Sequence, residues 1–152
     1  MHVSERAYVG ITPSLAKPPA AGERLQFVAT LNNSGRTPAI EMISHVTGVV
    51  SLSSESANQV YAEVTKTRSS SPSGSESIAT LSPGATAKNI IESTALTQPD
   101  LDQIIEGKVL IRIFANASYK DIFGHSHLTE ICFFYKPAGN AFLPCHEFNK
   151  SD

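Results

Sequence analysis

One stretch decides the fold class of this chain: Leu25-Gln26-Phe27-Val28-Ala29-Thr30-Leu31. Apolar residues occupy every second position, which predicts a half-buried β-strand because successive side chains of a strand point to opposite faces. The next residues, Asn32 to Ala39, contain Asn and Gly, which tolerate the left-handed backbone of a tight turn. A further apolar run from Ile40 to Leu52 completes a strand–turn–strand unit that is typical of a β-sandwich.

The remainder of the sequence extends this all-β pattern. Residues Tyr119 to Gly124 indicate a strand end and a hairpin turn, in which the Asp121 side chain bonds to nearby backbone amides. We therefore predict an immunoglobulin-like β-sandwich of about seven to nine strands. The further strands are expected at Arg6 to Thr12, Gln59 to Thr65, Ile78 to Leu81, Thr86 to Glu92, Val109 to Ala115 and Thr129 to Lys136.

A single helix is expected, from Gln98 to Glu106. Thr97 precedes it as a capping residue, Pro99 suits its first turn, and Gly107 ends it. One face of this helix is apolar, formed by Leu101, Ile104 and Ile105.

The chain of 152 residues has the length of one domain, so residues 1–152 are interpreted as a single immunoglobulin-like domain. A Ser-rich stretch near residues 67–77 predicts a loop. The C-terminal tail from Pro137 is also expected to be a loop, with Phe142, Leu143 and Phe148 packed back onto the domain.

The composition argues against two classes of function. Charged residues make up 17% of the chain, the formal net charge is −2, and the sequence has no basic block. Nucleic-acid binding is therefore not expected, because phosphate contacts need a Lys/Arg-rich face. No apolar run approaches the roughly 18 to 20 residues of a membrane-spanning helix, and the start of the chain lacks the pattern of a signal peptide. Any membrane association would need a tether outside this sequence.

Three segments resemble known bacterial proteins. The stretch Leu25 to Ala39, which ends in Thr-Leu-Asn-Asn-Ser-Gly-Arg-Thr-Pro-Ala, resembles the N-x-G-x-x-P-A turn of bacterial immunoglobulin-like modules, including adhesion-type repeats of envelope proteins. Residues Arg6 to Ile11 and Tyr119 to Cys132 resemble a narrower group of uncharacterised proteins, in which such a domain follows an N-terminal transmembrane helix and a short helical stalk. The resemblance implies a membrane-anchored bacterial protein of unknown function whose soluble domain lies outside the cytoplasm. It implies no catalytic residues.

His125 and His127 are the candidate metal ligands, with Asp121, Cys145 and His146 nearby in the sequence. Their H-x-H spacing places both side chains on one side of an extended strand, where they can bind zinc if further ligands arrive from elsewhere. The alternative is two exposed histidines that follow a glycine turn. We favour this alternative because the remaining ligands would have to come from a tail that the sequence does not place.

The two cysteines, Cys132 and Cys145, are either joined in a disulfide or reduced and unrelated. A bridge would contribute about 3 kcal/mol and would be plausible only in an oxidising compartment. Cys145 and His146 are adjacent, so in an extended chain they point in opposite directions and do not form a catalytic dyad. Arg112 interrupts an apolar strand and either faces solvent or pairs with a buried carboxylate such as Glu130.

No serine elbow, phosphate loop or convergent acid, base and nucleophile is visible, so neither an enzyme nor a cofactor is expected. The leading hypothesis is a protein-binding or scaffolding module whose partner is another protein. The alternative is a small-ligand or metal-binding domain that uses the histidine and cysteine region 121–146.

Overall fold

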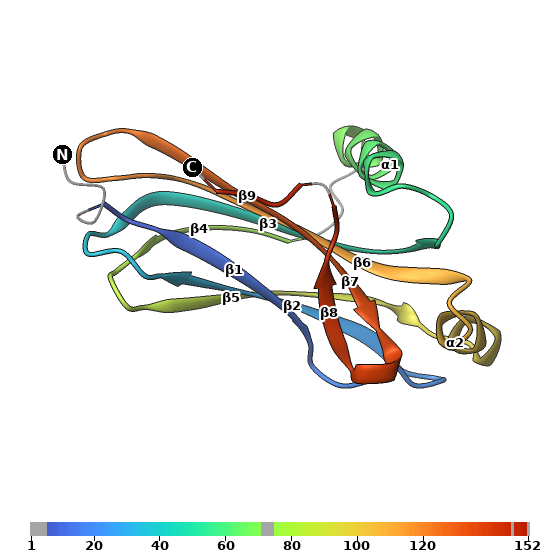
Figure 1. The fold of residues 1–152 in the computed structure, drawn as a ribbon. Helices are drawn as coiled ribbons and strands as arrows, with labels where there is room; N and C mark the ends of the chain where they lie inside the picture. Colours follow the sequence, from blue (N-terminus) through green and yellow to red (C-terminus); the bar gives the residue numbers. More distant parts are fainter. Residues whose placement is uncertain (1–5, 71–74, 147, 152) are drawn as a thin grey trace.

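The computed structural model describes residues 6–70, 75–146 and 148–151 (Figure 1). Within these residues it contains nine strands, two α-helices and one short 3-10 helix. In chain order they are β1 (Val9–Leu15), β2 (Arg24–Asn33), β3 (Ala39–Leu52), α1 (Ala57–Ser70), β4 (Ser75–Leu81), β5 (Thr86–Ala95), α2 (Gln98–Ile105), β6 (Val109–Lys120), β7 (Ser126–Lys136), η2 (Pro137–Gly139), β8 (Ala141–Pro144) and β9 (Lys150–Ser151).

The strands form two antiparallel sheets. One has the order β1-β2-β5, and the other has the order β4-β3-β6-β7-β8, with β9 also paired to β7. A constant-type immunoglobulin domain, numbered along the chain, pairs its fourth strand with its fifth. Here the fourth strand pairs with β3 in the opposite sheet. The predicted immunoglobulin-like β-sandwich is confirmed, with this one strand exchanged between the sheets.

The core lies between the two sheets, because alternate residues of each strand point inward. In β2 the predicted period of two holds: Leu25, Phe27, Ala29 and Leu31 are all buried in the core. Gly48 of β3 faces this layer so closely that a side-chain carbon there would overlap the ring of Phe27.

The turn after β2 is built around a buried amide. The Oδ1 atom of Asn33 accepts hydrogen bonds from the N–H groups of Tyr8 (3.2 Å) and Gly35 (3.0 Å). Its Nδ2 donates to the carbonyls of Thr37 (2.8 Å) and Leu81 (3.0 Å). Because all four bonding positions are filled, this buried polar side chain stabilises the turn.

The first strand begins at Val9 and ends at Leu15, so the prediction of a strand from Arg6 to Thr12 was wrong at both ends. Residues 6–8 precede the strand, and their backbone is held by the Asn33 turn instead: Tyr8 bonds to Asn33 and Ser34. We call residues 6–8 the N-terminal lead.

The helix expected after Thr97 is confirmed as α2. The Thr97 hydroxyl accepts a hydrogen bond from the Asp100 N–H, and the Asp100 carboxylate accepts one from the Thr97 N–H, which is a capping box. These bonds hold the pKa of Asp100 below its ordinary value. Ile104 is buried in the main core, so α2 closes one end of the sandwich (Figure 1).

The prediction of a strand over Gln59 to Thr65 was wrong, because these residues lie in helix α1. Ser56 and Gln59 form reciprocal hydrogen bonds between side chain and backbone N–H at its start. Residues Ala57, Val60 and Tyr61 then follow helical spacing and pack on Phe114 at the outer face of the larger sheet. The reciprocal bonds of Ser56 and Gln59 form a capping box, which favours a helix.

Part of the Ser-rich stretch near residues 67–77, which was predicted to be a loop, lies in a helix and a strand. Helix α1 extends to Ser70 and strand β4 begins at Ser75, where it pairs with Val46 of β3. Residues 71–74 lie outside the described residues. Tertiary pairing with β3 therefore orders part of a segment whose composition indicated a loop.

The tail from Pro137 was expected to be a loop, which was also wrong. It contains η2, β8 and β9, and both strands pair with β7. Phe142 packs on Tyr135 and Phe148 on Tyr61, as expected for side chains that pack back onto the domain. Leu143 is instead exposed.

Candidate functional site

The β6–β7 turn lies at the end of the sandwich opposite α2 (Figure 1). The Gly124 N–H donates to the Asp121 carbonyl, and the Asp121 N–H donates to the His125 carbonyl, both at 3.0 Å. Gly124 has a φ of 83°, the left-handed conformation that glycine adopts without steric cost. This geometry is typical of a short hairpin loop that ends in a left-handed glycine. The hairpin predicted from the sequence is confirmed.

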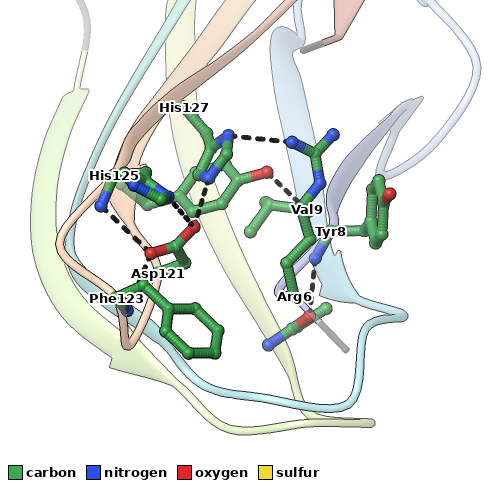
Figure 2. Close-up of polar contacts among 9 residues, drawn as sticks. Arg6, Tyr8, Val9, Asp121, Phe123, His125 and His127 are labelled. Atoms are coloured by element: carbon green, nitrogen blue, oxygen red, sulfur yellow. Dashed lines mark hydrogen bonds and ion pairs between the residues drawn. The ribbon is translucent and has the colours of Figure 1, made fainter. Parts of the chain in front are cut away.

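The carboxylate of Asp121 holds this turn from the inside. Its Oδ1 accepts hydrogen bonds from the N–H groups of Phe123 (2.8 Å) and His125 (3.0 Å), as the sequence predicted. Its Oδ2 lies 2.8 Å from Nε2 of His127 (Figure 2). Burial by itself raises the pKa of Asp121, but the hydrogen bonds from His127, His125 and Phe123 lower it to about 2. The side chain is therefore a buried, ionised acceptor at neutral pH.

His127 joins this turn to the N-terminal lead. Its Nδ1 lies 3.3 Å from a guanidinium nitrogen of Arg6, and its Nε2 faces Asp121 (Figure 2). A guanidinium has only donors, so Arg6 donates to the Nδ1 lone pair, which places the imidazole proton on Nε2. The Nε2–H group then donates a hydrogen bond to the Asp121 carboxylate. Sequence analysis missed Arg6 because 121 positions separate it from His127.

The start of β1 is tied to the same two strands. The Val9 N–H donates to the Tyr119 hydroxyl (3.3 Å), and the Thr129 hydroxyl donates to the Val9 carbonyl (2.7 Å). The Tyr119 ring lies against the His127 ring, with a centroid separation of 5.4 Å. These contacts connect the two sheets at this edge, so the polar network is part of the framework of the fold.

The two candidate metal ligands meet at Asp121. Strand β7 begins at Ser126, so His125 lies in the turn with its side chain 66% exposed, whereas the His127 side chain is 7% exposed. Nδ1 of His125 lies 3.5 Å from the same Oδ2 that His127 contacts. Among the described residues, no group of three or more His, Cys, Asp or Glu side chains could hold a metal ion. Metal binding by this pair stays a prediction that nothing here tests.

The candidate ligands Cys145 and His146 lie elsewhere. Cys145 is bonded to Cys132, which lies on β7 five residues after His127. At the rise of a strand this separation is about 17 Å, and an odd number of residues places Cys132 on the opposite face of the sheet from His127. The structure joins Cys132 and Cys145 in a disulfide, with their Cα atoms 5.3 Å apart. Asn149 reinforces this link, because its side chain bonds to the N–H and carbonyl of Cys132. The candidate ligands of region 121–146 therefore lie at two separate places, one at the β6–β7 turn and one at the disulfide, and do not form one site.

Arg112 does not face solvent, which contradicts the first of the two expected alternatives. It is only 5% exposed, and its guanidinium donates to the Ser51 hydroxyl (2.6 Å) and to the Glu55 carbonyl (2.7 Å). In the register of β6 and β7, Arg112 lies opposite Phe134, while Glu130 lies opposite Asn116. These bonds connect β6 to the segment between β3 and α1.

The tip of the β6–β7 turn carries two adjacent large apolar side chains. Ile122 is 50% exposed and Phe123 is 51% exposed. Sequence analysis noted this turn but not its apolar tip, although two such residues between Asp121 and Gly124 were a visible signal. Turns normally carry small or polar residues, so two large apolar side chains at this position are unusual.

Three adjoining hollows lie near α1, α2 and the C-terminal tail, with volumes of about 240, 250 and 230 Å³. Each is smaller than the roughly 300 to 1,000 Å³ that is usual for a small-molecule site. They carry no ligand proposal for this reason. The residues that adjoining hollows share are Leu110, Phe134, Ile104, Ile105, Tyr135 and Pro137.

Comparisons with known proteins do not identify the chain. No family model and no curated protein matches it. Among solved structures, the chain is similar to the X-ray structure of Northeast Structural Genomics Consortium target SoR45, with 14% sequence identity over 99% of each chain and a TM-score of 0.43. A score below 0.5 supports no inference about this chain. No helix in the described parts of the chain is long and apolar enough to cross a membrane.

Proposed function

We propose that this domain is a non-catalytic protein-binding module that docks through the β6–β7 turn. The observation that carries the proposal is the half-exposed pair Ile122 and Phe123 at the tip of that turn. Asp121 and Gly124 already supply what the turn needs, so the apolar pair contributes little to the fold. An aromatic side chain at the tip of a turn suits the role of an anchor, because a few buried aromatic residues supply much of the binding energy at protein interfaces.

The turn is rigid before any partner arrives. Asp121 holds the N–H groups of Phe123 and His125, and His127 holds Asp121 in turn. Ordering loops and side chains on binding is unfavourable in free energy, and this cost is smaller for a turn that is already ordered. The apolar pair is therefore presented in a fixed direction, as an anchor residue should be.

The acid–base groups beneath the turn favour a structural role over catalysis. The Asp121 side chain is fully buried, and both ring nitrogens of His127 have partners within the protein. A general base must reach the proton of a substrate. Here the imidazole is engaged between Arg6 and Asp121, which supports a non-catalytic module.

We place the module at a bacterial membrane, outside the cytoplasm, held by a segment beyond this chain. This placement rests on the resemblance to membrane-tethered envelope proteins. The Cys132–Cys145 disulfide supports it, because disulfides persist in oxidising compartments and are rare in the cytosol.

The partner expected is a protein with an apolar pocket that accepts the Phe123 ring. A photo-crosslinking phenylalanine analogue at position 123 captures such a partner in cells, and the captured protein is then purified for binding measurements. We expect Phe123→Ala to weaken its binding about tenfold, since a buried aromatic anchor contributes upwards of a kcal/mol. Ile122→Ala should also weaken it.

Ile90 is the matched control, since it is 52% exposed on the outer face of the other sheet. Ile90→Ala should leave the affinity unchanged. Equal binding by wild type and Phe123→Ala would contradict the proposal. Co-sedimentation with phosphatidylethanolamine–phosphatidylglycerol vesicles that is lost in Phe123→Ala would also contradict it, because the partner would then be a lipid surface.

A further inference from the structure

The N-terminal lead makes one charged contact with the larger sheet, through Arg6. Its guanidinium reaches Nδ1 of His127 at 3.3 Å and lies 4.5 Å from the centre of the Tyr8 ring. Arg6 is therefore held from two sides, by an aromatic face on its own segment and by a ring nitrogen on β7.

The Arg6 contact selects one tautomer of His127. An imidazole that accepts from Arg6 at Nδ1 must carry its proton on Nε2, where it donates to Oδ2 of Asp121 at 2.8 Å. In the other tautomer, the lone pair of Nε2 would face a carboxylate oxygen, which is repulsive. Arg6 thus favours the form of His127 that the carboxylate needs.

The Asp121 carboxylate, once fixed by His127, in turn fixes the backbone of the turn. While Oδ2 is held by His127, Oδ1 remains aimed at the N–H groups of Phe123 and His125. Without the His127 bond the carboxylate can rotate about its terminal torsion, which weakens both turn bonds. The groups form one continuous chain of hydrogen bonds from Arg6 to the tip of the turn (Figure 2).

We call the chain of contacts from Arg6 through His127 and Asp121 to the turn the relay, and we propose that it lets the N-terminal lead control the rigidity of the β6–β7 turn. Displacing Arg6 from β7 loosens the turn and weakens docking, and by reciprocity docking at the turn tightens the attachment of the lead. The inference rests on the proposed function only in identifying the turn as the docking site.

Arg6→Gln tests the relay in the isolated protein. We expect amide exchange at Phe123 and His125, measured by NMR, to accelerate about tenfold, because the imidazole that holds the Asp121 carboxylate is no longer fixed by Arg6. The ring nitrogen shift of His127 Nδ1 should change, because this nitrogen loses its guanidinium donor. Exchange at Phe27 of the other sheet should not change, which separates loosening of the turn from a general loss of stability.

Arg24→Gln is the matched control, because Arg24 is an exposed arginine that contacts Glu92. It should leave the exchange at Phe123 unchanged. A second comparison uses His127→Phe as the background, where Arg6→Gln should have no further effect on the turn.

Two results would overturn the relay: unchanged exchange at Phe123 in Arg6→Gln, or equal acceleration in the His127→Phe background. These measurements need no partner. Failure of the relay therefore leaves the crosslinking test of the docking site intact, and failure of docking leaves the exchange result standing.

Discussion

Removing the disulfide provides a quantitative test of how the C-terminal tail is held. The double variant Cys132→Ala/Cys145→Ala opens a loop in which the two cysteines are separated by 13 positions. On the chain-entropy model, closing a loop of this length stabilises the folded state by about 3 kcal/mol at 25 °C. For a domain of this size, that corresponds to a fall in Tm of about 10 °C.

Chemical denaturation followed by circular dichroism measures the loss, with wild type under non-reducing and reducing conditions as the reference. Reduced wild type should approach the stability of the double variant, because both lack the crosslink. Any remaining difference between them measures the effect of the two altered side chains. Denatured, non-reduced wild type should contain no free thiol. Equal stability of the double variant and oxidised wild type, or two free thiols in the oxidised protein, would refute the reasoning.

Three further substitutions test the framework. Asn33→Ala removes the hydrogen-bond partner of four backbone groups and should lower the free energy of unfolding, measured with denaturant, by about 3 kcal/mol. Its neighbour Asn32 is exposed, so Asn32→Ala is the control and should leave the stability unchanged. Gly48→Ala overlaps the Phe27 ring and should destabilise by about 1 to 3 kcal/mol in the same assay. Because the pKa of Asp121 falls from 3.8 to about 2 on folding, the stability that its carboxylate contributes should be complete above pH 3.8 and be lost as the pH falls through about 2. Asp121→Asn should remove this part of the acid dependence of unfolding. An unchanged acid profile in this variant would contradict the assignment.

Local signals in the sequence predicted much of the fold. The alternating residues of β2 and the capping Thr97 of α2 act through neighbours in the chain, so their structures could be inferred without knowing the rest. Asp121 belongs to this group, since its turn bonds reach only to Phe123 and His125.

Predictions failed where a distant contact decided the outcome. The strand predicted over Gln59 to Thr65 is part of helix α1, and the packing of Val60 on Phe114 cannot be seen from the local sequence. The tail after Pro137 has few strand formers of its own, yet it pairs with β7 and is held there by Cys145.

The sequence by itself determined the sandwich class, the hairpin at Asp121 and the cap of α2, because backbone preferences and the period of side chains are properties of short segments. Only the tertiary structure brought Arg6 to His127 across 121 positions and placed the candidate ligands His127 and Cys145 apart. The physical reason is that a polar contact between sheets depends on how strands stack, and one-residue changes in register move every side chain to the other face.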